Sequence, residues 1–150
     1  MKKFRFSLET VLDYKRQVLD ALQVEHGKIL AQVKAQETAI DEMEAAYRHL
    51  DGEFSRRKAE GITVVDAMKY DQYLRAAERQ LEEAYLRLEE LKELAEKKRQ
   101  EVVEARKETS SIEKLREKKL DSYNKAVQKS EEAMIDELVS TKRVMAAQGA

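Results

Sequence analysis

The residues that this sequence lacks restrict its fold more than those it contains. There is no proline and no cysteine in 150 residues, and there are only four glycines. Because proline breaks helices and glycine weakens them, their scarcity favours long, uninterrupted helices. The absence of cysteine excludes a disulfide framework and fits a reducing compartment. Aromatic residues make up only 6% of the chain, so we expect a thin hydrophobic seam instead of a thick globular core.

Charge is abundant but nearly balanced. Charged residues make up 39% of the chain, and the net charge is -1. That balance gives no reason to expect nucleic acid or an acidic membrane surface as a partner. The first residues lack the apolar stretch of a signal peptide, and no apolar run approaches the roughly 20 residues that cross a bilayer. We therefore expect residues 1–150 to form a single soluble, cytoplasmic domain.

Hydrophobic residues recur at alternating steps of four and three between residues 8 and 54. A 3.5-residue period held for this long is typical of a supercoiled helix. Only Lys15, His26 and Gln36 interrupt the apolar character of this first seam. The pattern predicts a first helix over about residues 7–59. The seam comprises Leu8, Leu12, Lys15, Leu19, Leu22, His26, Ile29, Val33, Gln36, Ile40, Met43, Tyr47, Leu50 and Phe54.

A single strong turn signal interrupts the helical pattern. Gly61 is followed by Thr63 and, three residues later, by Asp66. A threonine at this spacing caps an early backbone amide, and the acid lies at the positive end of the helix dipole. We expect a turn at about residues 60–63 and a second helix over about residues 64–145.

The second helix carries its own seam, with large and small residues alternating. It comprises Tyr70, Leu74, Ala77, Leu81, Ala84, Leu88, Leu91, Ala95, Lys98, Val102, Ala105, Thr109 and Ile112. The two seams predict an all-α fold, a long two-helix antiparallel coiled-coil hairpin whose second helix is longer than the first. Pairing outward from the turn places Leu8 near Arg116. The second helix beyond about residue 118 is then expected to have no partner within the chain.

The open end of this hairpin, where both termini lie, is predicted to be basic. Lys2, Lys3 and Arg5 meet a basic stretch over residues 97–119. Apolar residues continue beyond Ile112 out of phase with the seam, and unpaired apolar helix faces are typical of partner-binding surfaces. The apolar residues that we expect to be exposed at this end are Phe4, Phe6, Leu120, Tyr123, Met134 and Leu138.

The sequence contains none of the usual catalytic or metal-binding patterns. It has no glycine-rich phosphate loop, no cysteine and only two histidines, so neither a nucleotide nor a zinc site is expected. The basic clusters alternate with glutamates, which argues against nucleic-acid binding. A two-helix hairpin also offers no concave pocket for acid–base catalysis. We expect no enzymatic activity, no cofactor and no metal.

The two ends of the chain resemble a known family. The opening segment over residues 4–13, FRFSLETVLD, resembles the start of FliJ, a small coiled-coil component of the bacterial flagellar export apparatus. Residues 113–119, followed by Tyr123, resemble its later helix. Residues 132–137, EAMIDE, resemble a stretch of the family that ends in Asp-Glu, with Met134 where a lysine or similar polar residue is common. The resemblance covers essentially the whole chain.

The resemblance implies a non-enzymatic part of the flagellar type III protein export apparatus. Members are similar in shape to the γ stalk of rotary ATPases. They bind and stimulate the export ATPase FliI, contact the cytoplasmic domain of the export gate FlhA, and interact with export chaperones. This implies a cytoplasmic protein held peripherally at the flagellar base through its partners, without inserting into the membrane.

The same resemblance suggests two contact surfaces. The open end is expected to bind the ATPase ring through Phe4, Arg5, Phe6, Leu115, Arg116, Lys119, Leu120, Tyr123, Met134 and Leu138. The gate is expected to contact Gln36, Ile40, Met43, Tyr47, Tyr73 and Ala77. Two alternatives stay open: a related stalk of a non-flagellar type III secretion system or rotary ATPase, and a generic coiled-coil adaptor or chaperone.

Overall fold

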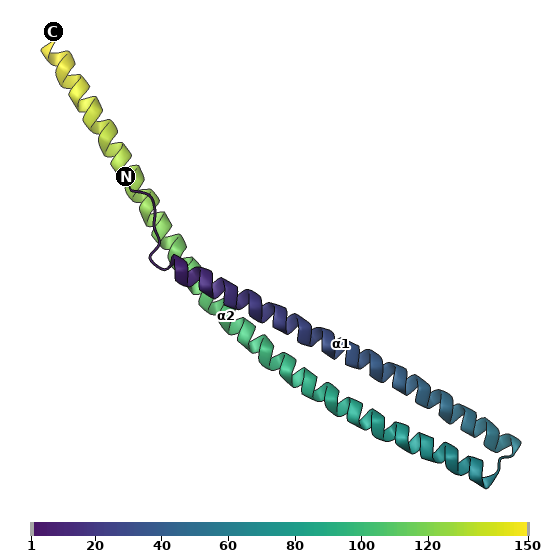
Figure 1. Cartoon of the computed structure of the whole chain (residues 1–150). Helices are drawn as coiled ribbons and strands as arrows, with labels where there is room; N and C mark the ends of the chain where they lie inside the picture. Colours follow the sequence, from purple (N-terminus) through teal and green to yellow (C-terminus); the bar gives the residue numbers. More distant parts are fainter. Residues whose placement is uncertain (1, 150) are drawn as a thin grey trace. The chain divides into compact units, whose positions relative to one another are not determined.

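The computed structural model describes residues 2–149 and consists of two antiparallel helices joined by one short turn (Figure 1). Helix α1 spans Glu9–Glu60, 52 residues, and helix α2 spans Val64–Gln148, 85 residues. Residues 2–149 contain no strand. The predicted all-α hairpin with a longer second helix is therefore confirmed.

The beginning of α1 differs slightly from the sequence expectation of residue 7. The amide of Glu9 donates to the carbonyl of Phe6 at 3.1 Å, and the amide of Leu12 donates to the carbonyl of Leu8 at 2.8 Å. Residues 7 and 8 form a turn, and the helix begins at Glu9. Residues 2–6, before this turn, belong to neither a helix nor a strand.

The turn between the helices has the geometry that its sequence predicts. Gly61 adopts a positive φ of 103°, the left-handed conformation that commonly ends a helix and that glycine accepts without strain. The Thr63 hydroxyl accepts a hydrogen bond from the Asp66 amide at 3.2 Å, and the Thr63 carbonyl accepts one from the Ala67 amide at 3.0 Å. Thr63 therefore caps α2.

Both predicted seams face the interior of the hairpin. Every seam position between Leu8 and Phe54, and between Tyr70 and Ile112, is buried or half-buried. The most deeply buried seam residues are Leu12, Ile40, Leu74, Leu88, Leu91, Ala95, Val102, Ala105 and Thr109. The 3.5-residue pattern thus selects the buried face of each helix correctly.

The chain divides into two compact units, of which one is the hairpin over Asp20–Val103. Next to its turn, the rings of Phe54 and Tyr70 stack with centroids 5.1 Å apart. Further along the same unit, the Lys98 ammonium lies 3.0 Å from the Glu25 carboxylate. The polar seam residue Lys98 therefore joins the two helices through an ion pair beside the apolar contact.

The other unit combines the chain up to Leu19 with the chain from Glu104 onward. Three ion pairs join its helices, Lys15 to Glu108 at 2.8 Å, Arg16 to Glu113 at 3.1 Å and Arg116 to Glu9 at 2.9 Å. The buried Thr109 hydroxyl donates to the carbonyl of Ala105 at 2.8 Å, so this polar seam residue is satisfied within its own helix. Neither helix contains an apolar stretch that is long enough to span a lipid bilayer.

Candidate functional site

The N-terminal segment, residues 2–8, is anchored on α2. The Tyr123 hydroxyl donates to the carbonyl of Lys2 at 2.5 Å. The rings of Phe4 and Tyr123 lie 5.6 Å apart at 53°, and the Arg116 guanidinium lies 5.6 Å from the centroid of the Phe4 ring. Phe6 is only 9% exposed. The segment therefore covers the stretch of α2 from Arg116 to Tyr123.

This packing corrects the expectation that Phe4, Phe6, Leu120 and Tyr123 are exposed. Phe6 is buried, and the other three are half-buried. The expectation assumed that only a helix can cover α2 beyond residue 118. An extended segment also covers it here, because the ring of Phe4 lies against Tyr123 and Arg116 of α2.

The base of the N-terminal segment matches the predicted pairing. Arg116 donates to the carboxylate of Glu9 at 2.9 Å, which confirms that the beginning of α1 lies beside Arg116. Leu115 is partly exposed at 38%, and Arg5 and Lys119 are exposed. The structure thus brings together the predicted open-end residues of the N-terminal segment and those of α2 up to Tyr123.

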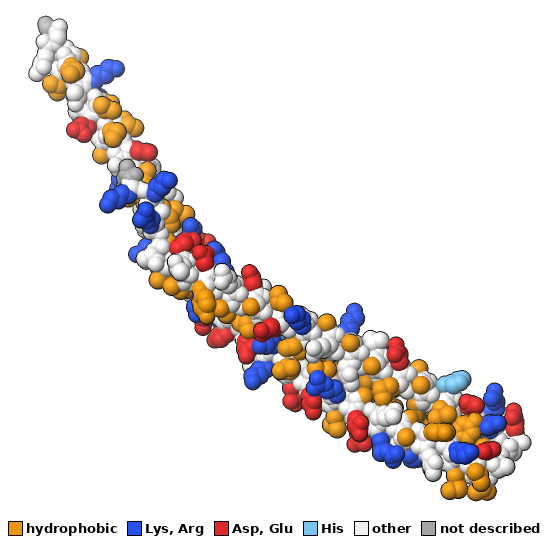
Figure 2. Space-filling view, in the orientation of Figure 1, with side chains coloured by type: hydrophobic (Ala, Val, Ile, Leu, Met, Phe, Trp, Pro, Cys, Tyr) orange, Lys and Arg blue, Asp and Glu red, His pale blue; other side chains and the backbone are white. Residues whose placement is uncertain are grey.

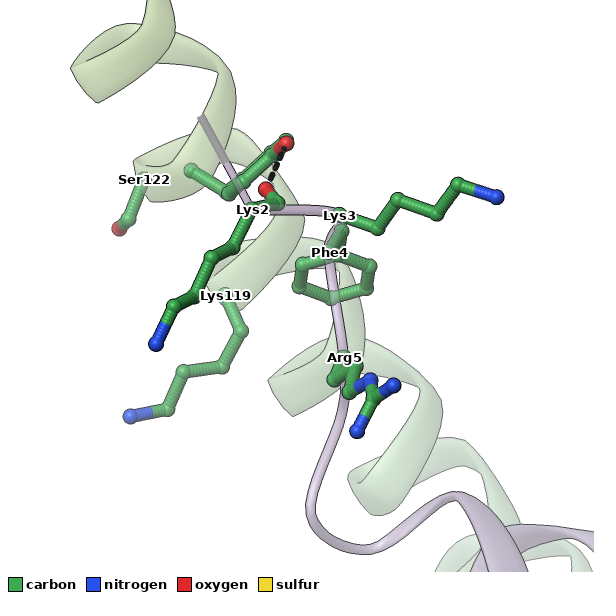
Figure 3. Close-up of a pocket in the computed structure, with 7 residues that line it drawn as sticks. Lys2, Lys3, Phe4, Arg5, Lys119 and Ser122 are labelled. Carbon is green, nitrogen blue, oxygen red and sulfur yellow. Dashed lines mark hydrogen bonds between the residues drawn. The ribbon is translucent and has the colours of Figure 1, made fainter.

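A hollow of about 920 Å³ lies between the N-terminal segment and α2 (Figure 3). We call this feature the basic hollow; its lining residues are Lys2, Lys3, Phe4, Arg5, Lys119, Ser122 and Tyr123. Among residues 2–149, its four cationic side chains form no ion pair. Two nearby acids pair with other cations, Glu9 with Arg116 and Asp121 with Lys125 at 3.2 Å.

The last part of α2 exposes apolar side chains. Every residue from 128 to 149 is exposed, and hydrophobic side chains are visible along this part of α2 in Figure 2. Met134 and Leu138, predicted from the sequence to be exposed, are 63% and 64% exposed. We call this feature the apolar stripe; its large members are Met134, Ile135, Leu138, Val139, Val144 and Met145.

The six residues proposed for the gate contact differ widely in accessibility. Ile40 is buried and Tyr73 is 63% exposed, whereas Gln36, Met43, Tyr47 and Ala77 are half-buried in the seam. Gln36 donates to the carbonyl of Ala84 at 2.9 Å. Only Tyr73 in this set presents most of its side chain to solvent.

Tyr47 is tied into a polar cluster on the seam. Its hydroxyl donates to the carboxylate of Glu78 at 2.8 Å, and Arg75 lies 2.7 Å from the same carboxylate. The hydrogen bond to Glu78 raises the pKa of Tyr47. The same bond, together with Arg75, lowers the pKa of Glu78. This pattern fits an inter-helix connection better than a proton-transfer site.

The sequence interpretation missed several members of both surfaces. Lys2 and Lys3 were recognised only as part of a basic end. Four exposed apolar residues near Met134 and Leu138 were not predicted to belong to a binding surface: Ile135, Val139, Val144 and Met145. The hollow depends on an extended segment that lies over α2, for which no periodic signal exists. Among the described residues, no group of three or more His, Cys, Asp or Glu side chains is placed to hold a metal.

Comparison with known proteins identifies one family. Residues 4–148 match the family model described as "Flagellar FliJ protein". No curated protein and no solved structure matches the chain significantly. The match covers both helices, the turn and most of the N-terminal segment.

Proposed function

Because the chain belongs to the flagellar FliJ family, we propose that this flagellar export component binds and stimulates the export ATPase FliI through its terminal end. The terminal end consists of the N-terminal segment and α2 from residue 113 onward. One observation carries the proposal: every residue of α2 from 128 to 148 is exposed, including the large apolar side chains of the stripe.

Exposed apolar side chains on one helix favour association with a partner. Complete burial of a methionine or leucine side chain contributes about 1.5–3 kcal/mol relative to leaving it in water. A helix without tertiary contacts is also only marginally stable by itself. A partner groove that accepts α2 therefore gains apolar burial and stabilises the helix at the same time.

The remaining partners of the export apparatus are proposed to use other surfaces. For the cytoplasmic domain of the gate FlhA, the exposed Tyr73 is the best direct contact of the six candidates. We propose that Gln36, Ile40, Met43, Tyr47 and Ala77 position the two helices beneath such a contact. Binding to FlhA and to export chaperones would hold the protein at the cytoplasmic face of the flagellar base.

The ATPase proposal is tested with a double variant of the apolar stripe, Met134→Ser/Leu138→Ser. We expect this variant to lose co-purification with FliI and to lose stimulation of ATP hydrolysis by about tenfold or more, because two central apolar contacts are removed. The matched control is Met68→Ser/Leu86→Ser, which changes the same residue types at 58% and 60% exposure in the other unit.

Equal effects of the two double variants would contradict a role for the apolar stripe. Full stimulation by Met134→Ser/Leu138→Ser would contradict it as well. Circular dichroism of both variants serves as the folding control, since the substituted side chains are all exposed and the helical signal is expected to be unchanged.

A further inference from the structure

We propose that the basic hollow binds an extended, carboxylate-rich segment of a partner protein. The hollow has an appropriate size, because about 920 Å³ lies within the range of ligand sites on proteins. Its rim carries Lys2, Lys3, Arg5 and Lys119, while the rings of Phe4 and Tyr123 line its wall. Lysine and arginine recognise carboxylates, and the rings provide apolar contact for a peptide backbone.

The positive charge of the hollow is not neutralised within the described chain. Of the acids near the hollow in sequence, Glu9 is held by Arg116 and Asp121 by Lys125, while Glu117 pairs with none of its four cations. The side chains of Lys2 and Lys119 extend in the same direction (Figure 3), so their charges repel each other and raise the local concentration of anions. An incoming acidic segment relieves that repulsion. Figure 2 also shows Lys and Arg side chains gathered around this part of α2.

The hollow is preorganised by contacts that do not involve its charges. The Tyr123 hydroxyl holds the backbone carbonyl of Lys2 at 2.5 Å, and the ring of Phe4 lies against the ring of Tyr123. Figure 3 shows the side chains of Lys2 and Lys119 extending in the same direction. The backbone of Lys2 is thus held in place before a ligand binds, which lowers the entropic cost of binding. The ammonium groups of Lys2 and Lys119 can then contact the same ligand.

The arrangement favours an acidic peptide over an anionic membrane or nucleic acid. The side chain of Lys3 points away from Lys2 and Lys119 in Figure 3, whereas a flat bilayer is best met by cations on one face. Further along α2, Glu131, Glu132, Asp136 and Glu137 are exposed. These carboxylates would repel a long polyanion that followed the helix but would not meet a short segment bound at the hollow.

This inference rests on the proposed function for the choice of partner, since the ATPase is the protein expected at the terminal end. The hollow and the apolar stripe use different chemistry and no common residue. Each can therefore be removed separately. The stripe supplies apolar burial, and the hollow supplies charge-dependent recognition.

The test uses the full chain and a fluorescent hexaglutamate peptide, with binding followed by anisotropy at low ionic strength. We expect Lys2→Glu/Lys119→Glu to weaken binding by about tenfold or more, because two contacts become repulsive. The matched control Lys118→Glu/Lys129→Glu makes the same change in net charge at exposed lysines that do not line the hollow. We expect the control to weaken binding only about two- to threefold.

A second variant, Tyr123→Phe, removes the hydroxyl that holds Lys2 without changing any charge. Weaker hexaglutamate binding by this variant supports preorganisation of the hollow. Equal losses in the two charge-reversal variants, or no hexaglutamate binding to the wild-type chain, would overturn the proposal. Anionic vesicles and an oligonucleotide of equal charge are tested in the same way. If either binds more tightly than hexaglutamate, and if Lys2→Glu/Lys119→Glu weakens that binding equally, the proposal is overturned in favour of that ligand.

The same variants separate this inference from the ATPase proposal. If the wild-type chain binds hexaglutamate at the hollow but does not bind FliI, the proposed function fails and the acidic-segment site stands. If FliI binding depends on Met134 and Leu138 while hexaglutamate does not bind, the inference fails and the proposed function stands.

Discussion

Tyr47 lies on the seam of α1 but carries a hydroxyl group, which needs a partner in a half-buried position. Glu78 of α2 supplies that partner, and Arg75 balances the carboxylate. Lys15 and Gln36 interrupt the same seam and are accommodated similarly, by Glu108 and by the carbonyl of Ala84. Tyr47, Lys15 and Gln36 therefore each connect α1 to α2 through a hydrogen bond or an ion pair.

The Tyr47–Glu78 contact predicts a dependence of stability on acid pH. The pKa of Glu78 is lowered in the folded chain from its ordinary value of 4.5. Its contribution to stability is therefore complete above about pH 4.5 and is lost as the pH falls through the lower folded pKa. We expect the melting temperature to decrease between pH 5 and pH 3, and to decrease less in Glu78→Gln. Thermal melts followed by circular dichroism measure both.

The control for this prediction is Glu82→Gln, which changes an exposed carboxylate one turn further along α2. We expect the melting temperature of Glu82→Gln to depend on pH as that of the wild type does, because Glu82 forms no ion pair among the described residues. Glu96 and Glu101 also have lowered pKa values, caused by hydrogen bonds from Arg99 and Lys98. Glu78→Gln is therefore expected to reduce the pH dependence and not to abolish it.

At the scale of elements, two glycines of the hairpin have opposite roles. Gly61 ends α1 with a φ of 103°, whereas Gly52 lies inside α1. An added Cβ at either position meets no other atom within 4 Å. Contacts therefore do not distinguish the two positions, and the backbone conformation alone decides the effect of a substitution.

This difference predicts opposite changes in stability for the same substitution. We expect Gly61→Ala to lower the free energy of unfolding by about 1–2 kcal/mol, because an L-residue is strained at positive φ. We expect Gly52→Ala to raise it by about 0.5–1 kcal/mol, because alanine favours the helix. Urea unfolding of both variants measures the change; the same sign in both would contradict the cap geometry.

The position of the N-terminal segment was not predicted from the sequence. Its motif of two phenylalanines separated by one residue was recognised, but both rings were expected to be available to a partner. The segment has no helical period, so neither its path nor its contacts follow from the pattern. Its position depends on Tyr123, Arg116 and Phe4 meeting across more than a hundred residues of sequence.

At the scale of the whole molecule, burial is unevenly distributed along α2. Leu88, Leu91, Ala95, Val102, Ala105 and Thr109 are all buried, whereas every residue from 128 to 149 is exposed. Local opening of a helix costs little free energy where no tertiary contact has to be broken. The end of α2 should therefore open far more often than its middle.

Hydrogen exchange provides a direct measurement of that difference. We expect the amides of residues 130–148 to exchange at least about tenfold faster than those of residues 88–109 in the isolated protein. Addition of FliI should slow exchange in residues 130–148 selectively. Strong protection of this stretch in the isolated protein would show that a partner, such as a second copy of the chain, already covers it.

The sequence by itself determined the two helices, the turn at Gly61 and the pairing of the seams. These features depend on local properties: the 3.5-residue period of apolar residues, the lack of proline, and the cap formed by Thr63. Such signals are repeated along the chain and agree with each other, so the sequence alone is enough to predict these features.

Only the tertiary structure decided which part of the terminal end is covered and which is free. The extended N-terminal segment reaches as far as Tyr123 and its own Phe6 is buried, while the apolar stripe beyond residue 128 remains exposed. The physical reason is that these contacts join segments distant in sequence through single side chains, with no repeating pattern. The basic hollow has the same origin, because it exists only where the segment and α2 meet.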